Sequence, residues 1–343
     1  MNANTNVGGS APRAASARRR LGRSGVWVTA LSLGTAPLGN LFGAVTDRQA
    51  AAVLDAAFEV GIGYLDTAPH YGVGLAEERL GRALAGRDRA AFTLSTKVGR
   101  LLRPLRDGEQ PDAQGFVDTP PRAREWDFSA AGIRASLEAS LERLGLDRID
   151  VALLHDPDNH EREVYEAGYA ALAALRAQGV VGAIGAGMNQ SAMPTRFVRD
   201  FDLDVVLCAG RYTLLDQSAL ADLLPECGRR GTSVVFGGVF NSGLLANPRP
   251  GATFDYVTAP EQLVRKAQTI AAVCARHGVP LKAAALQFPL RQPAAASVLV
   301  GCRSEAEVRE NAALFAHPIP DLLWAELAES GLVAPEAVRL GGY

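Results

Sequence analysis

The chain has 343 residues, of which 48% are hydrophobic and 21% charged, and its formal net charge is −2. Such a chain can bury a large core without disulfides or structural metals, and its charge argues against a nucleic-acid-binding surface as the main function. Its four cysteines (Cys208, Cys227, Cys274 and Cys302) form no CxxC pair, so neither a zinc site nor a disulfide framework is predicted, and a reducing cytoplasm is expected.

The first residues are expected to lie outside the fold. Residues 1–17 are rich in Ala, Asn, Gly and Ser, and we predict a disordered tail there, followed by one domain over 18–343. The arginines at 18–20 are not followed by the apolar stretch that an export signal needs. No later segment has the length and apolar character of a membrane span.

Short apolar segments then alternate with longer amphipathic ones. In chain order, the apolar spacing predicts strands at 31–34, 64–65, 92–96, 149–154, 180–185, 205–207, 233–236 and 296–300. Helices are predicted at 47–59, 76–84, 130–144, 163–177, 218–230, 261–277, 281–290 and 305–314. Thr46 and Ser129 are placed to cap the helices that follow them.

This alternation predicts an α/β fold in which eight parallel strands close into a (β/α)8 TIM barrel. A doubly wound sheet is the competing architecture, but it needs a GxGxxG turn after an early strand. Neither 72–74 nor 182–187 has that spacing. Two insertions at 101–126 and 245–259 follow strands, and we expect them to form long loops at the C-terminal face of the barrel.

Four side chains suited to acid–base chemistry follow predicted strands: Asp66, Tyr71, Lys97 and His155. In a barrel, all of them point towards one mouth. A lysine ammonium beside a tyrosine would lower the phenol's pKa, and a carboxylate would hold that lysine in place. A histidine could orient a substrate oxygen. We therefore predict hydride transfer between a nicotinamide and a carbonyl or hydroxyl carbon, with Tyr71 as general acid/base.

Simpler interpretations of these residues stay open at this point. Asp66 and Lys97 could form a structural ion pair, and His155 could be an interior histidine. His70 could line the pocket or only pack, and Trp126 could contact substrate or pack its loop down. No metal site is predicted around 155–158, because no second histidine lies at ligand spacing.

These motifs resemble the aldo-keto reductase family over about residues 18–318. The resemblance rests on GYLDTA (63–68), HYG (70–72), EERLG (77–81), LSTKVG (94–99), LLHD (153–156), VGCRS (300–304) and EN (310–311), in this order. It implies that Asp66, Tyr71, Lys97 and His155 are the catalytic tetrad. It also implies an N-terminal β-hairpin that plugs the bottom of the barrel, which residues 19–28 match.

The resemblance further implies contacts to a nicotinamide dinucleotide. Asn189 matches the family's carboxamide-binding asparagine, whereas the usual glutamine is replaced by Ala209. The aromatic that stacks on the nicotinamide is missing from 236–238, and Phe240 or Tyr212 could replace it. The other implied cofactor contacts are Gly34, Gly238, Gly301, Arg303, Glu307 and Asn311. The implied substrate contacts are His70, Trp126 and Tyr212.

The adenosine end favours NAD over NADP. Family members that prefer NADP carry Lys and Arg where this chain has Gly301 and Glu307. A carboxylate repels a 2′-phosphate but accepts a hydrogen bond from a ribose hydroxyl. NADP stays an alternative because Arg303 could bind the phosphate.

Three segments, 34–41, 185–190 and 209–215, are similar to the sugar 1-dehydrogenases of this family. We therefore expect a cytoplasmic enzyme that oxidises an aldose of the L-fucose, D-arabinose or L-galactose type to a lactone. The alternatives are an NADPH-dependent aldehyde or ketone reductase, a pyridoxal 4-dehydrogenase, and a nucleotide-sensing binding subunit. The expected partner is a small sugar or aldehyde, without nucleic acid or membrane, and homo-oligomers stay open.

Overall fold

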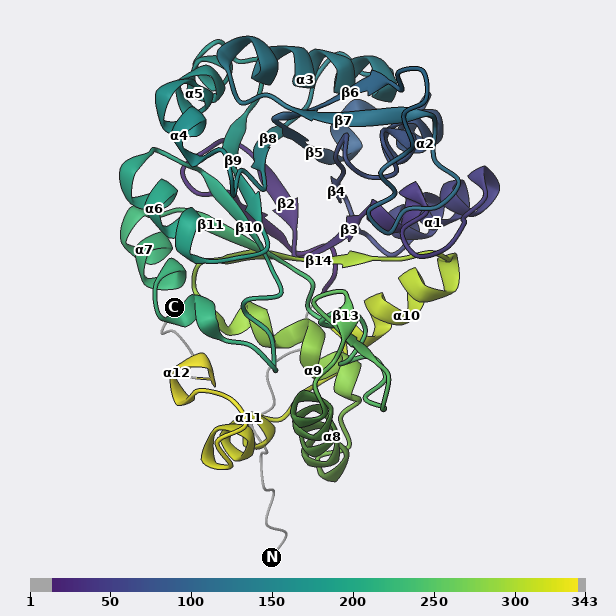
Figure 1. Ribbon diagram of the computed structural model, residues 1–343. Coiled ribbons are helices and arrows are strands. Elements are labelled where there is room, and N and C mark those ends of the chain that lie inside the picture. The colour runs from purple at the N-terminus through teal and green to yellow at the C-terminus, as the bar shows by residue number, and fades with distance from the viewer. Residues whose placement is uncertain (1–13, 339–343) are drawn as a thin grey trace, which may run out of the picture.

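The computed structural model describes residues 14–338, and its centre is a closed barrel of parallel strands (Figure 1). The strands follow one another around the barrel in chain order, and β14 closes the ring against β3. Their bounds are β3 Leu31–Gly34, β4 Tyr64–Asp66, β5 Thr93–Val98, β8 Val151–His155, β9 Ala183–Met188, β10 Val205–Ala209, β11 Ser233–Gly237 and β14 Ala295–Gly301. The predicted (β/α)8 fold is confirmed.

Helices surround the barrel. They are α1 Asp47–Glu59, α2 Leu75–Leu84, α3 Ala130–Leu144, α4 Glu161–Glu163, α5 Tyr169–Ala177, α6 Ala192–Asp200, α7 Leu223–Arg230, α8 Glu261–Arg276, α9 Leu281–Gln287, α10 Glu305–Phe315, α11 Asp321–Glu329 and α12 Pro335–Val338. The predicted caps are confirmed, because Thr46 forms a capping box with Gln49 and the Ser129 side chain accepts from Gly132 N.

Several element boundaries differ from the prediction. The fifth strand covers Ala183–Met188 rather than 180–185, because the Val180 N–H donates to Leu175 O and so closes the preceding helix. The helix predicted at 163–177 contains a π-helical turn at Val164–Gly168. The helix predicted at 218–230 is divided into a 3-10 turn, Ser218–Leu220, and helix α7.

Helices α6 and α11 were not predicted. Helix α6 has a weak sequence signal because it is short and contains Pro194 in its first turn, yet it buries Met193 and Phe197. Packing against the barrel, rather than intrinsic helix propensity, therefore holds this segment.

The predicted tail is wrong at its C-terminal end. Residues 1–13 lie outside the described residues, but 14–17 form a turn against the barrel. Ala30 N donates to Ala17 O over 2.7 Å, and Leu31 N donates to Ala15 O over 3.2 Å. Ala15 is buried in the core. Small, low-complexity residues predicted disorder, but here their backbone pairs with the start of the barrel.

The N-terminal hairpin covers one end of the barrel, as predicted. Strands β1 (Arg18–Arg20) and β2 (Trp27–Thr29) pair antiparallel, and Leu21 between them is fully buried. Leu21 belongs to the cluster that fills the barrel interior, together with Tyr64 and Val205. The hairpin thus excludes water from the closed end of the barrel.

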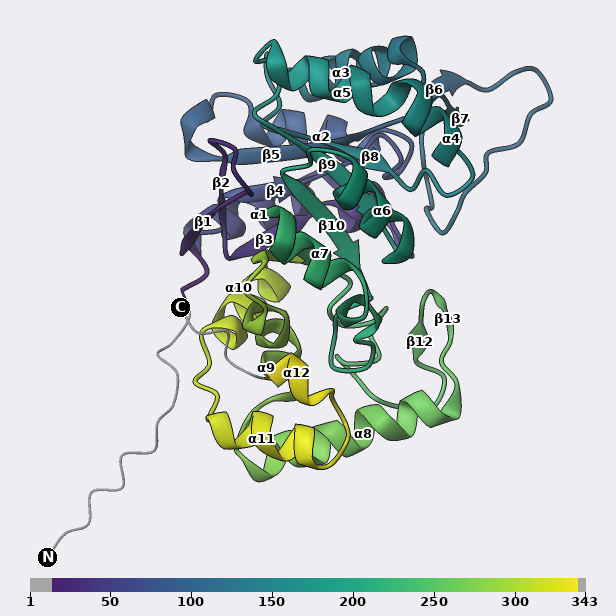
Figure 2. The same cartoon turned by 90° about the vertical axis from the view of Figure 1, so that its left-hand side faces the viewer.

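The two predicted long loops contain hairpins of their own. The first holds β6 (Arg100–Pro104) and β7 (Arg122–Trp126), and the second holds β12 (Thr253–Phe254) and β13 (Val257–Thr258). Figure 2 shows both hairpins on the side of the barrel opposite to β1 and β2. This is the end where the barrel strands finish and where a site is expected.

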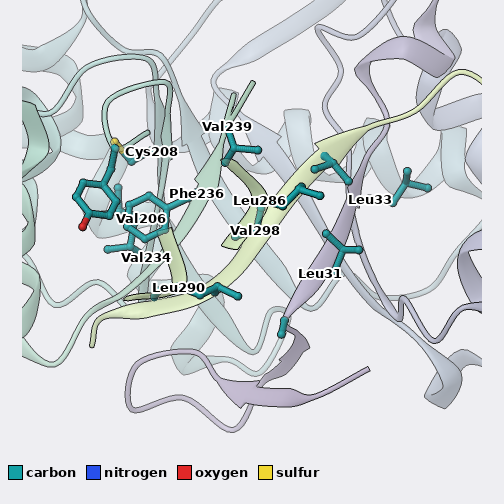
Figure 3. Packing of buried hydrophobic residues seen from close by; sticks show 14 of the residues in the cluster. Leu31, Leu33, Val206, Cys208, Val234, Phe236, Val239, Leu286, Leu290 and Val298 are labelled. Atoms are coloured by element: carbon teal, nitrogen blue, oxygen red, sulfur yellow. The ribbon is translucent and has the colours of Figure 1, made fainter. Parts of the chain in front are cut away.

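A second apolar layer lies between the barrel and its helices. Along β10, Val205 and Leu207 belong to the interior cluster, whereas Val206 and Cys208 belong to the outer one. This alternation follows from the two-residue period of a strand. Figure 3 shows Val206 and Cys208 in the same layer as Leu286 of α9. Both faces of the strand are therefore buried, as in a parallel barrel.

We predict that Leu21→Ala destabilises the protein by about 2–5 kcal/mol, because it leaves a cavity in the closed end of the barrel. Urea unfolding followed by circular dichroism measures this loss. The matched control is Leu322→Ala, whose side chain is 64% exposed and which should change stability by less than about 0.5 kcal/mol. Equal effects of the two substitutions would contradict the role of the hairpin as a plug.

Candidate active site

A cavity of about 750 Å³ opens at the carboxyl ends of the barrel strands. All four residues of the predicted tetrad line it: Asp66, Tyr71, Lys97 and His155. Its walls come from loops that follow the strands and include Phe42, Gln114, Phe116, Phe240 and Tyr256. The fold thus gathers side chains from distant parts of the sequence around one enclosed space.

Lys97 is the centre of the hydrogen-bond network. Its Nζ donates to Asp66 Oδ2 over 2.7 Å, to Tyr71 Oη over 2.8 Å and to Thr67 O over 3.0 Å. The other carboxylate oxygen, Asp66 Oδ1, accepts from Ser95 Oγ over 2.7 Å. The Lys97 and Asp66 side chains are only 2% and 0% exposed, so this ion pair is desolvated and fully hydrogen-bonded.

A tight turn holds Tyr71 above Lys97. Residues 72–74 all adopt a positive φ, which is most unusual for the β-branched Val73. A Cβ on Gly72 would lie 2.3 Å from Gly39 O, so only glycine allows this close approach of the two backbones. The turn is therefore fixed by packing against the loop that follows β3.

Lys97 lowers the pKa of Tyr71, as predicted, but burial has the larger effect. Burial raises the pKa of Tyr71 to about 12, and the nearby Lys97 charge offsets only part of this effect. Burial also lowers the pKa of Lys97, but Asp66 and Tyr71 raise it by more, so the ammonium stays charged. Without ligand, the site therefore holds a neutral phenol against a charged lysine at neutral pH.

Two neutral histidines lie beside Tyr71. Burial, followed by the charge of Arg100, lowers the pKa of His70 to about 2 and that of His155 well below its ordinary value. The ring centroids of Tyr71 and His155 are 6.0 Å apart, and those of His70 and His155 are 5.5 Å apart. Neither Nδ1 has a hydrogen-bond partner within residues 14–338. His70 lines the cavity, which favours the first of its two interpretations.

An ion pair that the sequence did not reveal lies next to the histidines. Arg100 Nη2 donates to Asp156 Oδ2 over 2.6 Å, and both residues line the cavity. The same oxygen is 3.5 Å from His155 Nε2. The only sequence signal was position, since Arg100 follows β5 closely and Asp156 directly follows β8.

Glycine backbone lines the opposite part of the cavity. Four predicted cofactor residues lie there: Gly34, Asn189, Gly238 and Gly301. A strip without side chains lets a long, flat ligand approach the backbone. In an adjoining pocket, the buried Asn241 has an Oδ1 without a hydrogen-bond partner among the described residues. These features fit a nicotinamide dinucleotide, which needs both an open strip and amide partners.

The other predicted cofactor residues do not line the cavity: Arg303 lies just before α10, Glu307 in its first turn and Asn311 further along it. Glu307 Oε2 accepts from Arg303 N over 2.7 Å, and Arg303 Nη2 donates to Leu41 O over 2.7 Å. Asn311 is buried, and its Nδ2 contacts Cys302 Sγ at 3.4 Å. Glu307 and Arg303 thus flank the turn after Gly301, whereas Asn311 packs below it.

Two predicted substrate contacts, Tyr212 and Trp126, do not line the cavity. Tyr212 is buried against Phe236 and Phe288, away from the cavity, and its hydroxyl accepts from Gln292 Nε2 over 2.9 Å. Trp126 does not line the cavity either. Its ring packs on the Arg100 guanidinium, with 4.1 Å between the guanidinium carbon and the ring centroid. Of the two candidates for the stacking aromatic, only Phe240 reaches the cavity.

The described residues also bear on cysteine reactivity, metal binding and membrane spans. Cys208 and Cys302 are buried, and burial raises the pKa of each thiol to about 12, so they are inert. Within residues 14–338, no group of three or more His, Cys, Asp or Glu side chains is placed to hold a metal ion. None of the helices there has enough length and apolarity to span a bilayer.

The fold and the site together define a barrel oxidoreductase, and comparison with known proteins gives its family. The model of the aldo/keto reductase family matches residues 30–331, and the chain belongs to this family. It is therefore an oxidoreductase that uses a nicotinamide dinucleotide and acts on a small molecule.

The chain is similar to individual members of the family. The chain is 48% identical to a D-threo-aldose 1-dehydrogenase of a Pseudomonas species over 90% of its own length and 96% of the relative's. It is 40% identical to a pyridoxal 4-dehydrogenase of Microbacterium luteolum, covering 93% and 99%. Among solved structures, a holo-form aldo-keto reductase of Bacillus halodurans matches with a TM-score of 0.72 and 26% identity, covering 95% and 97%.

We predict that Asp66→Asn costs roughly 3–5 kcal/mol of stability, because it leaves the buried Lys97 charge without its counter-ion. The double variant Asp66→Asn with Lys97→Met should regain most of that loss, since it removes the charge as well. Urea unfolding of both variants and the wild type measures the difference. A double variant no more stable than the single one would show that the buried charge is not the cause.

Proposed function

We propose that the protein oxidises an aldose at its anomeric carbon to the lactone with NAD, and that the tetrad performs this reaction. The hydrogen bond of 2.8 Å between Lys97 Nζ and Tyr71 Oη, inside the cavity, carries the proposal. It pairs a phenol with a fixed positive charge that stabilises the phenolate. The likeness to a D-threo-aldose 1-dehydrogenase supports a sugar as substrate.

In this mechanism, the substrate's anomeric hydroxyl lies against Tyr71 Oη. Tyr71 takes the hydroxyl proton as phenolate, while the C–H bond at the same carbon breaks and the carbonyl forms. The bound nicotinamide supplies the hydride acceptor. Lys97 stabilises the phenolate, Asp66 holds Lys97, and the neutral His155 directs Nε2 at the reacting oxygen.

The choice of NAD is part of the proposal. Glu307 lies at the start of α10 with its carboxylate close to Arg303 N. This negative charge would repel a 2′-phosphate, and the Arg303 guanidinium is already bonded to Leu41 O. Asn189 would bind the carboxamide, and the strip formed by Gly34, Gly238 and Gly301 would hold the rest of the dinucleotide. We also propose a cytoplasmic location, which the four free thiols support.

We predict that the protein oxidises one of L-fucose, L-galactose and D-arabinose much faster with NAD than with NADP. The absorbance of the reduced nicotinamide measures the rate. Tyr71→Phe should lower kcat/KM by about 100- to 10,000-fold, since it removes the general base. Its NAD affinity, measured by fluorescence titration, should match the wild type. Its unfolding should stay cooperative, with a free energy of unfolding lower by about 1–3 kcal/mol because one N–H of the buried Lys97 loses its acceptor.

Other outcomes would change the assignment. Turnover of pyridoxal alone would favour a pyridoxal 4-dehydrogenase, the activity for which the second relative is named. Reduction of simple aldehydes with NADPH, without sugar oxidation, would favour the reductase alternative. Binding of dinucleotide without turnover of any substrate would leave only a nucleotide-sensing role.

The raised pKa of Tyr71 predicts a pH dependence with a definite sign. Oxidation needs the phenolate, and below the pKa of about 12 the phenolate fraction grows with pH. We expect kcat/KM for sugar oxidation to rise by up to about tenfold per pH unit between roughly pH 7 and 10. Lactone reduction needs the phenol and should not increase over that range. A flat oxidation profile would argue against Tyr71 as the base.

A further inference from the structure

The wall of the cavity next to His155 is charged, and the chemistry assigned to the tetrad does not use this charge. Arg100 and Asp156 line the cavity as an ion pair of 2.6 Å, with side chains 7% and 18% exposed. Burial raises the pKa of Asp156, and the nearby Arg100 charge offsets only part of this effect. A desolvated ion pair is costly unless its remaining lone pairs are used.

One oxygen of Asp156 has no partner. Oδ2 accepts from Arg100, whereas Oδ1 accepts no hydrogen bond from any residue within 14–338. Asp156 also adopts a left-handed backbone with φ of +40°. Backbone strain of this kind is retained where it places a side chain for function.

The surrounding residues hold the pair in position. The guanidinium of Arg100 packs on the Trp126 ring, which faces it across the β6–β7 hairpin. Asp156 N donates to Gly187 O over 3.0 Å, which fixes the turn after β8. Because both partners are held, the Asp156 carboxylate is a preorganised acceptor in the wall of the cavity.

The position of this acceptor relative to Tyr71 decides what it can bind. Substrate oxygen that reacts must contact Tyr71 Oη and His155 Nε2, and Asp156 Oδ2 is 3.5 Å from that same nitrogen. With the reacting oxygen at His155 Nε2, a hydroxyl on the neighbouring carbon would be within reach of the Asp156 carboxylate. A carboxylate accepts strongly from a hydroxyl and repels an anion.

We propose that Asp156 is a specificity-determining residue that accepts a hydrogen bond from the hydroxyl on carbon 2 of the sugar, and that Arg100 is its positioning residue. This inference rests on the proposed function, because it assumes oxidation at carbon 1. It assigns the substrate class as sugars with a free hydroxyl next to the reacting carbon. A site built to bind a hydroxyl rejects an analogue without it, since its buried acceptor stays unpaired.

The test compares pairs of sugars that differ only at carbon 2: L-fucose with 2-deoxy-L-fucose, and D-arabinose with 2-deoxy-D-ribose. The wild type should prefer the hydroxylated sugar by about 100-fold or more in kcat/KM. Asp156→Asn should lose about 100-fold on the hydroxylated sugar and less than about threefold on the deoxy sugar, so that the preference collapses. A merely structural role would reduce both activities alike.

The matched control is Asp158→Asn, an exposed carboxylate two residues away that bonds Gln190, and it should keep the wild-type preference. If the wild type oxidises both sugars of a pair at similar rates, the inference is overturned and the proposed function stays intact. This measurement needs no variant. An Asp156→Asn protein that keeps the preference also overturns it. Failure of the wild type to oxidise any aldose overturns the proposed function, and the inference with it.

Discussion

The charge of Lys97 is the constraint on which the site depends. An ammonium that is 2% exposed cannot be left unpaired, and its three N–H groups bond a carboxylate, a phenol and a backbone carbonyl. All three partners lie within residues 66–71, at the end of β4 and just after it, so this segment has to lie against Lys97. The closed barrel meets this demand because β4 and β5 are neighbours, so Asp66 and Lys97 emerge side by side.

The same strand also ties the site to the outer layer. Thr96, next to Lys97, points the other way and donates from Oγ1 to Glu77 Oε1 over 2.7 Å. Glu77 lies on α2, which begins just after the Tyr71 turn, and this buried carboxylate forms an ion pair of 2.7 Å with Arg143 of α3. The positions of Tyr71 and Lys97 are thus linked twice, by their direct hydrogen bond and through α2.

The sequence could predict those site residues whose positions follow from the strands of the barrel. It could not predict the features of the site that depend on side-chain packing. Asp66 and His155 end their strands and Lys97 lies one residue before the end of β5, so the barrel fold sufficed to gather them. Tyr212 and Trp126 were misplaced because an aromatic near a strand end can turn to the core as well as to the mouth. The net direction of the Tyr71 pKa depends on burial, which one sequence does not show.

The part of the cavity that fits the dinucleotide and the part that would hold the substrate have different walls. Glycine backbone lines the end that fits the dinucleotide, and such a surface hardly distinguishes substrates. The other end is built on the β6–β7 hairpin, in which Arg100 pairs with Trp126 in register. The insertion predicted at 101–126 thus ends in Trp126, which holds the Arg100 side chain in the cavity wall near His155. Substrate choice can therefore change with this hairpin while Lys97 and its partners stay the same.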